Sequence, residues 1–282
     1  MVARLAVFAA ALYLMAPQAP FRAETRLVVL HVSVEDGGGE PVGGLEQAAF
    51  TVYEDGARQP IALFRRDDVP VSMGLLIDNS GSMRQRRAQV ESAALALAGA
   101  SNPGDEIFVM NFADRPHLDV PLTRERQVLE ARIARVDSIG GTALYDAVEA
   151  GTEAVGAGTH DRRVLVVISD GRDNASQESF AGALMRAERA DVAVFAIGLG
   201  DDRHARHDLD RLTQRTGGAV LYPMDDVKGA ALDIARRIRT QYTVAYAPMK
   251  QALDGSYRTI KVSVGASGHP RVRTRSGYWA TR

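Results

Sequence analysis

Hydroxyl and carboxyl side chains follow two apolar runs at the points where those runs end. Asp78, Ser80 and Ser82 come after the first run, and Asp170 comes after the second. Between them in the sequence, Thr142 follows a pair of glycines and precedes a helical pattern. If the two runs are strands of one parallel sheet, their carboxyl ends meet at the same rim, where ligands collect. The sequence therefore predicts that these five side chains share one site.

The donor set of this site contains oxygen atoms and neither imidazole nor thiolate. Such a hard set suits Mg²⁺, and also Mn²⁺ or Ca²⁺, and disfavours zinc. Mg²⁺ prefers six ligands and gives up water reluctantly, so a site with few protein ligands keeps water or accepts an outside oxygen. Each of the five residues also has an ordinary structural interpretation, in a turn, a helix start or a strand end. Their joint placement favours a metal.

Apolar runs of strand length alternate with helical patterns between residues 70 and 240, which is typical of a mainly parallel sheet with helices on both faces. We expect a doubly wound, Rossmann-like α/β domain. The predicted strands are Val71–Ile77, Ile107–Phe112, Val164–Ser169, Val192–Ile197 and Ala219–Tyr222. The predicted helices are Ala88–Ala98, Arg124–Val136, Ala143–Val155, Phe180–Arg189, His207–Thr216 and Val227–Arg239.

The segments on either side of this block, residues 25–69 and 241–282, have the alternating pattern of short β-strands. The predicted strands are Leu27–Val34, Phe50–Tyr53, Tyr242–Tyr246, Thr259–Val264 and Val272–Tyr278. Because two or three strands are rarely stable alone, we expect the two ends of the chain to form one small β-sandwich, into which the α/β domain is inserted.

The first 24 residues predict export. A positive residue, Arg4, precedes the apolar stretch Leu5–Ala16, which is too short to span a bilayer and is typical of a secretory signal peptide. An uncleaved anchor is the alternative. We therefore expect a periplasmic or secreted protein. The sequence has no cysteine, so neither disulfides nor thiol chemistry contribute.

Composition narrows the possible partners. The chain has 34 basic and 35 acidic residues, so no net positive field attracts nucleic acid or an anionic membrane. There is no phosphate-binding lysine loop, so no nucleotide is expected, and there is no zinc-protease helix or nucleophile elbow. A hydrolase would have to use the metal itself to activate water, with Asp78 or Asp170 as base. The sequence therefore favours a binding protein over an enzyme.

The spaced pattern Asp78-x-Ser80-x-Ser82, Thr142 and Asp170 resembles the metal-ion-dependent adhesion site of von Willebrand factor A domains, and integrin I domains are similar. The resemblance covers residues 70–240. It implies that the three hydroxyls coordinate the metal directly or nearly so, that the two aspartates hold it largely through water, and that a partner's carboxylate completes its coordination. The flanking segments resemble exported bacterial proteins related to von Willebrand factor A, of the kind frequent in acidobacteria.

Three further groups of residues have both a functional and a plain interpretation. Arg84, Arg86 and Arg87 could ring the site, or form a solvated helix face. Asp146 could tie down the metal loop, or complement a helix N-terminus. The polar run from Asp201 to Asp210, with His204 and His207, could hold a second metal or simply begin a helix. The sequence favours the plain interpretation each time.

These observations predict an exported module that uses a bound divalent cation to hold a Glu or Asp of a partner protein. The first alternative is a structural subunit of a cell-envelope assembly in which the metal stabilises the loops. A magnesium-dependent hydrolase is the second alternative.

Overall fold

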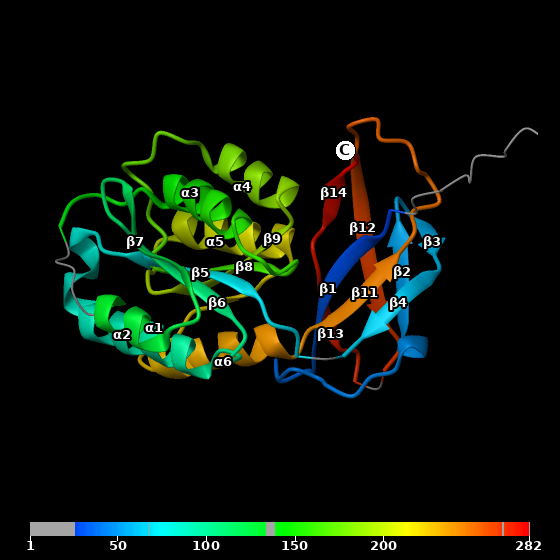
Figure 1. Ribbon diagram of the computed structural model, residues 1–282, viewed down its shortest axis with the longest axis horizontal. Helices are drawn as coiled ribbons and strands as arrows, with labels where there is room; N and C mark the ends of the chain where they lie inside the picture. Colours follow the sequence, from blue (N-terminus) through cyan, green and yellow to red (C-terminus); the bar gives the residue numbers. More distant parts are fainter. Residues whose placement is uncertain (1–25, 67, 134–138, 267, 282) are drawn as a thin grey trace, which may run out of the picture.

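The protein, in a computed structural model, is described for residues 26–66, 68–133, 139–266 and 268–281. The expected signal peptide lies outside these residues, as do the last three residues of the helix predicted for 124–136. An α/β part and a β-sandwich lie side by side, and the chain passes from the sandwich into the α/β part and back again (Figure 1). No helix in the described ranges is both long and apolar enough to cross a membrane.

The α/β part is built on a six-stranded sheet with strand order β10-β9-β8-β5-β6-β7. All neighbouring pairs are parallel except β6 with β7. The strands are β5 (Ser72–Asp78), β6 (Glu106–Phe112), β7 (Pro116–Thr123), β8 (Arg163–Ser169), β9 (Val192–Gly198) and β10 (Val220–Leu221). β7 was not predicted from the sequence, because Pro116 and Pro121 disfavour a strand interior and are tolerated only at an edge such as this one.

Helices cover both faces of the sheet, which confirms the predicted fold class. One apolar cluster joins the sheet to α1, α2 and α6, and a second joins its other face to α3, α4 and α5 (Figure 1). The helices are α1 (Arg87–Ala100), α2 (Arg126–Ile133), α3 (Leu144–Gly156), α4 (Phe180–Arg189), α5 (Arg203–Thr216) and α6 (Val227–Arg239), and a short 3-10 helix, η2 (Gly81–Arg86), precedes α1.

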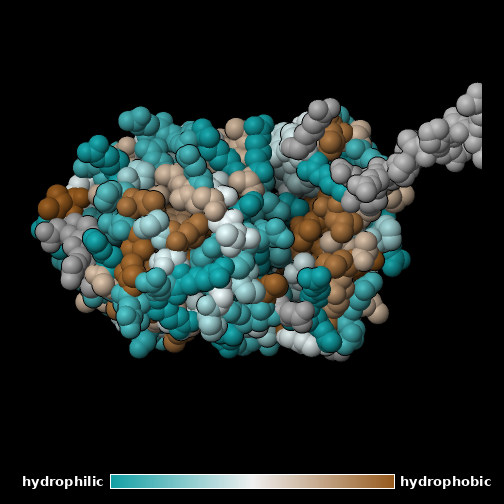
Figure 2. Space-filling model, viewed as in Figure 1, coloured by the Kyte–Doolittle hydropathy of each residue, from teal (hydrophilic) through white to brown (hydrophobic). Residues whose placement is uncertain are grey.

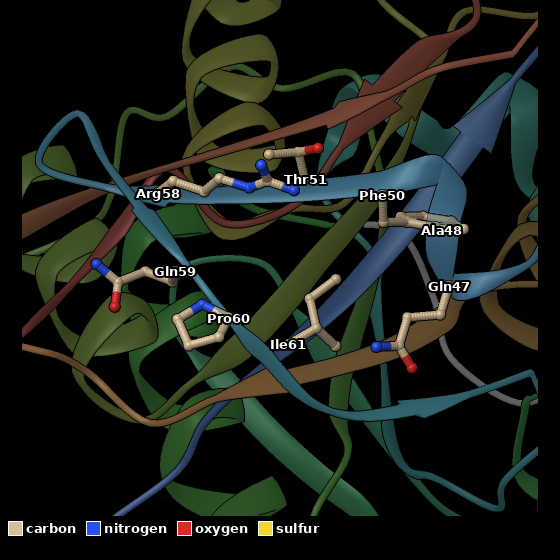
Figure 3. A pocket seen from close by; sticks show the side chains of 8 residues that line it. All are labelled: Gln47, Ala48, Phe50, Thr51, Arg58, Gln59, Pro60 and Ile61. Atoms are coloured by element: carbon tan, nitrogen blue, oxygen red, sulfur yellow. The ribbon is translucent and has the colours of Figure 1, made fainter.

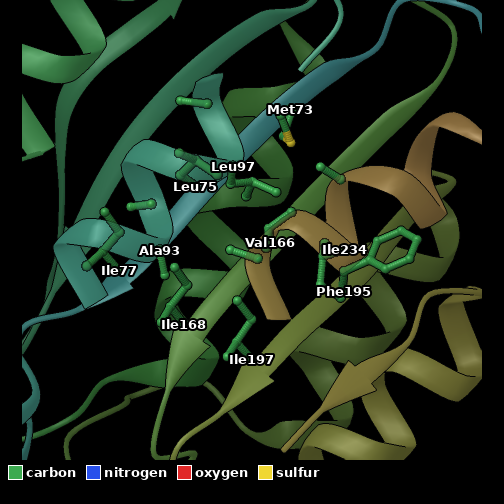
Figure 4. Packing of buried hydrophobic residues seen from close by; sticks show 14 of the residues in the cluster. Met73, Leu75, Ile77, Ala93, Leu97, Val166, Ile168, Phe195, Ile197 and Ile234 are labelled. Atoms are coloured by element: carbon green, nitrogen blue, oxygen red, sulfur yellow. The ribbon is translucent and has the colours of Figure 1, made fainter. Parts of the chain in front are cut away.

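The central strand β5 shows how the sheet is held between its two helical layers. Leu75 points to the layer of α1, where it packs near Leu97 (Figure 4), and Leu76 belongs to the cluster on the opposite face. Both leucines are fully buried. Gly74 leaves room for a neighbour, because a Cβ atom there would lie 2.2 Å from the ring of Phe108. This packing fixes the position of β5 and therefore that of Asp78 at its carboxyl end.

The two ends of the chain together form a β-sandwich of two four-stranded antiparallel sheets. Their strand orders are β13-β1-β11-β4 and β14-β12-β2-β3, so each sheet contains strands from both ends. The strands are β1 (Val28–Glu35), β2 (Phe50–Glu54), β3 (Ala57–Gln59), β4 (Ile61–Arg65), β11 (Tyr242–Tyr246), β12 (Tyr257–Val264), β13 (Arg271–Arg273) and β14 (Gly277–Trp279), and a 3-10 turn, η1 (Gln47–Ala49), precedes β2. One apolar cluster fills the space between the sheets.

A buried polar network ties four of these strands together. Glu54 accepts hydrogen bonds from the hydroxyls of Tyr246, at 2.7 Å, and Tyr278, at 2.9 Å. Its other oxygen lies 3.3 Å from a guanidinium nitrogen of Arg258. The carboxylate and the guanidinium are both almost fully buried. Because a buried charge without a partner is costly, the network favours a single arrangement of β2, β11, β12 and β14.

Arginine side chains join the sandwich to the α/β part. Arg237 in α6 pairs with Glu35 in β1, and both side chains are buried. Arg275, between β13 and β14, lies 2.5 Å from the carboxylate of Asp191 and donates to the carbonyl of Val29 at 2.8 Å. These contacts use both ends of the chain and two sides of the α/β part.

His31 lies at this junction and should make stability depend on pH. Burial, together with the charges of Arg162 and Arg275, lowers the pKa of His31 from 6.5 to about 3. Between these values the unfolded chain binds the proton and the folded chain does not, so stability falls as the pH falls. We expect a loss of about 2 kcal/mol between pH 7 and pH 5 that is absent in His31→Gln.

Urea denaturation of both proteins at the two pH values measures this effect. The difference between them isolates His31, because other groups, including Asp78 with its raised pKa, titrate in both proteins. An equal loss in wild type and His31→Gln would contradict the assignment.

Candidate functional site

The sheet places the two aspartates of the predicted site on adjacent strands. β5 and β8 are parallel neighbours, with Ile77 opposite Ile168. Asp78 is the last residue of β5, and Asp170 follows the last residue of β8. Gly200, from the loop after β9, packs so closely that a Cβ atom there would lie 2.4 Å from the carbonyl oxygen of Asp170. Both carboxylates therefore lie at the carboxyl rim.

Asp78 is the buried floor of the site, with 2% of its surface exposed. It accepts hydrogen bonds from the backbone N–H of Ser80, at 2.9 Å, and from the hydroxyl of Ser169, at 2.5 Å. Burial, with a smaller contribution from the charge of Asp170, raises the pKa of Asp78 from 3.8 to about 6. A cation above Asp78 would offset both effects, because it favours the ionised carboxylate.

Ser80 and Ser82 lie beside Asp78, at the start of η2, with Ser80 immediately before this helix and Ser82 in its first turn. Their hydroxyl oxygens are 3.0 Å apart. Neighbouring ligands of an octahedral Mg²⁺, with bonds of ~2.0–2.1 Å, are separated by about 2.9 Å. Ser80 is buried, whereas Ser82 is exposed. The pair can therefore serve as adjacent ligands of one small cation that remains accessible from outside.

The loop that carries Thr142 is fastened to the serine loop. The backbone N–H of Gly81 donates to the carbonyl of Gly140 at 3.1 Å. Gly140 has φ of 95°, a conformation that favours glycine. The N–H of Thr142 donates to the side-chain oxygen of Asn174 at 2.8 Å, and Thr142 is 2% exposed. The structure thus brings the loops after β5 and before α3 together beside the loop after β8.

Three residues that support these loops were missed in the sequence analysis. Ser169 donates to Asp78, Asn174 accepts from Thr142, and Asp114 accepts from the N–H of Gly141 at 2.7 Å. Asp114 follows β6 much as Asp78 ends β5, so the rule of strand ends could have indicated it. Ser169 is the last residue of β8, so the same rule applies to it, whereas Asn174 has no comparable sequence signal.

Arg87 and Asp146, two of the secondary candidates, have structural roles. Arg87 donates to the side-chain oxygen of Asn79, so it supports the serine loop. Asp146 lies in the first turn of α3 and accepts from the backbone N–H groups of Gln177, at 3.0 Å, and Glu178, at 2.8 Å. It therefore complements the helix start, as favoured from the sequence, and also holds the loop that follows Asp170.

The polar run near His204 begins a helix. Asp202 caps α5 by accepting from the N–H groups of His204, at 2.9 Å, and Ala205, at 3.0 Å. No group of three or more His, Cys, Asp or Glu side chains that could hold a metal occurs in the described part of the chain. The candidate site is not such a group, because three of its five residues are serine or threonine.

The residues present fit a small divalent cation. Two carboxylates supply negative charge, and hydroxyls from two loops supply neutral oxygens, the donor set that Mg²⁺ and similar ions accept. The site is built from loops, and an extensive network of hydrogen bonds holds those loops in place. This arrangement can bind an ion with few direct protein ligands and leave part of its coordination sphere to an outside group.

Comparison with known proteins places the fold. The sequence matches a family model described as the von Willebrand factor type A domain over residues 73–172. A search of curated proteins gives no significant match. The matched residues lie within the α/β part, which has the fold typical of that domain.

Solved structures resemble the chain at low sequence identity. A von Willebrand factor type A protein from Catenulispora acidiphila matches with a TM-score of 0.54 and 10% identity, over 89% of this chain and 73% of that one. An aerotolerance-related membrane protein from Bacteroides fragilis matches with a TM-score of 0.52 and 17% identity, over 60% of this chain and 98% of that one.

Proximal thread matrix protein 1 from the mussel byssus matches with a TM-score of 0.54 and 17% identity, over 66% of this chain and 50% of that one. That structure is described as having a zinc-occupied metal-ion-dependent adhesion site. At these identities the likeness concerns the fold.

Proposed function

We propose that this protein is an exported binding module that uses a divalent cation, in the first instance Mg²⁺, to hold a Glu or Asp carboxylate of a partner protein. The metal ligands in this proposal are Asp78, Ser80, Ser82, Thr142 and Asp170. The observation that carries it is the pair of hydroxyls 3.0 Å apart beside the buried Asp78, at a rim that is open to solvent.

Each side chain has a distinct part in this function. Ser80, Ser82 and Thr142 present neutral oxygens, while Asp78 and Asp170 compensate the ion's charge. When bound, the ion supplies a Lewis acid that accepts an outside carboxylate. Asp78 is already occupied by Ser80 and Ser169, so it is poorly placed to act as a base for a water molecule. This favours binding over hydrolysis.

The neutral hydroxyls also favour a carboxylate partner. Three neutral donors leave the ion with more positive charge than three carboxylates would, so an anionic group from outside is attracted more strongly. The near-neutral composition gives no reason to expect nucleic acid or a nucleotide. We further propose that the protein functions in the periplasm or outside the cell, on the basis of the signal-like first 24 residues.

Affinity capture from envelope extracts tests this function. We expect a partner to be retained by the wild-type protein in Mg²⁺ and released by EDTA, and Thr142→Ala to capture none in either condition. Thr240→Ala is the matched control, because Thr240 is exposed and hydrogen-bonds within its own helix. Retention of the same partner in excess EDTA would refute the proposal.

The same experiment distinguishes the proposed binding module from the first alternative, a structural subunit of a cell-envelope assembly. In a structural subunit stabilised by metal, EDTA lowers the melting temperature while the partner stays bound. Thermal melting measured beside the capture distinguishes these two outcomes. The hydrolase alternative requires product formation that depends on Mg²⁺ and on Asp78.

A further inference from the structure

A groove opens at the free side of the β-sandwich, outside the domain that carries the cation site. It is lined by Gln47, Ala48, Phe50, Thr51, Arg58, Gln59, Pro60 and Ile61. Figure 3 shows the side chain of Ile61 directed toward Phe50 across the groove, with Arg58 above them. The groove thus lies between the two sheets, at the point where the chain crosses from β3 to β4.

Unpaired strand edges border this groove. β4 is the last strand of its sheet and pairs only with β11. β3 is short and pairs with β2 only from Val52 to Glu54, so the other edge of β2 at Phe50 and Thr51 has no strand beside it. An edge strand presents backbone N–H and C=O groups that can pair with another extended chain.

The side chains of β4 are mostly apolar, whereas the edge strands of natural sheets usually carry charged residues or proline. β4 contains four consecutive apolar residues, Ile61 to Phe64, and no lysine or proline interrupts them. Figure 2 shows apolar residues over the sandwich, as well as over the α/β part, on the visible face. Arg58 and Arg65 flank the edge, and neither forms an ion pair with any described residue, whereas the neighbouring Arg66 pairs with Glu46.

We propose that this edge binds an extended segment of a partner protein as an added β-strand, in which aliphatic and acidic residues alternate. The backbone of the segment pairs with β4. Its aliphatic side chains enter the groove over Phe50 and Ile61, and its carboxylates lie against Arg58 and Arg65. Alternation follows from strand geometry, because successive side chains point to opposite faces.

The groove favours a separate segment over a second copy of this chain. In a symmetric pair, β4 of each copy would already use its inward side chains in its own core, where Phe64 packs against Phe50 with ring centres 5.1 Å apart. Such a pair would leave the groove unfilled. A separate strand brings side chains of its own to fill it.

The probe is a fluorescent nine-residue peptide, blocked at both ends, in which valine and glutamate alternate. We expect saturable binding by fluorescence anisotropy. A valine–lysine peptide should bind at least about tenfold more weakly, and the valine–glutamate peptide with alternate backbone nitrogens methylated should not bind. Two further peptides, in which isoleucine or phenylalanine replaces the valines of the valine–glutamate peptide, complete the panel.

Two variants locate the binding site. Ala48→Trp places a bulky side chain in the groove from an exposed position, and Arg58→Glu reverses the charge at its rim. Each should lower the affinity for the valine–glutamate peptide by about tenfold, a difference of about 1.4 kcal/mol in binding free energy. Lys261→Glu, an equal charge reversal at an exposed position on β12, should leave the affinity unchanged.

Absence of binding by every peptide of the panel overturns the proposal, as does binding that neither groove variant weakens. A concentration-dependent dimer, seen by light scattering and dissociated by Ala48→Trp, would instead assign the edge to a second copy and also overturn it. These measurements are made in EDTA, so their result is independent of the cation site.

Discussion

Saturating Mg²⁺ should raise the melting temperature of the wild-type protein and leave that of Thr142→Ala unchanged. A ligand at 100 times its dissociation constant adds about 2.7 kcal/mol to stability, which corresponds to a shift of roughly 5–10 °C for a domain of this size. Thr142→Ala removes one hydroxyl from a loop held by backbone contacts, namely Gly81 to Gly140 and Thr142 to Asn174. Differential scanning calorimetry with and without Mg²⁺ measures the shift.

The variant Thr240→Ala serves as the control for this experiment and should keep the full shift. Circular dichroism of Thr142→Ala without metal should match that of the wild type, because its loop contacts remain. A shift in Thr142→Ala equal to that of the wild type would show that Mg²⁺ binds elsewhere.

Replacing Glu54 with alanine should destabilise the sandwich by about 3–5 kcal/mol, because it leaves the buried guanidinium of Arg258 without its carboxylate. The hydroxyls of Tyr246 and Tyr278 lose their acceptor at the same time. Urea denaturation followed by tryptophan fluorescence suits this measurement, because Trp279, in β14, is the only tryptophan of the chain.

Glu46→Ala is the matched variant. Glu46 lies in the same N-terminal segment and pairs with Arg66, but its side chain is 74% exposed. Exposed pairs contribute at most about 1 kcal/mol. Equal and small losses in the two variants would show that the Glu54 network contributes little to stability.

Much of this arrangement could be predicted because local sequence and global fold agree. β8 and β9 are apolar on both faces, as central parallel strands require, and Asp78 and Asp170 follow strands that proved to be neighbours. The left-handed Gly217 ends α5, as its sequence indicates. The five candidate ligands were therefore found from strand ends and residue types, and their coordination of a metal stays a prediction.

Other features could not be read from local patterns. Val272–Tyr278 was predicted as one strand, but the chain crosses between sheets within it, so β13 and β14 lie in different layers. β3 and β4 were missed for the same reason, since Pro60 separates two short strands that join different sheets. Asn174 acts through a contact with Thr142, from a loop far apart in the sequence, which only the folded chain reveals.

Each sheet of the sandwich contains strands from both ends of the chain, and this determines the order in which the parts of the chain can fold during synthesis. β1 pairs with β11 and β13, and β2 pairs with β12, partners that lie about two hundred residues further along the chain. While a ribosome or export channel releases the chain, the sheet of residues 72–221 has all its strands before β1 and β2 have these partners. β1 must therefore wait unpaired and the β2–β3 hairpin must wait for β12, and we expect this interval to be the stage at which the nascent chain depends most on chaperones.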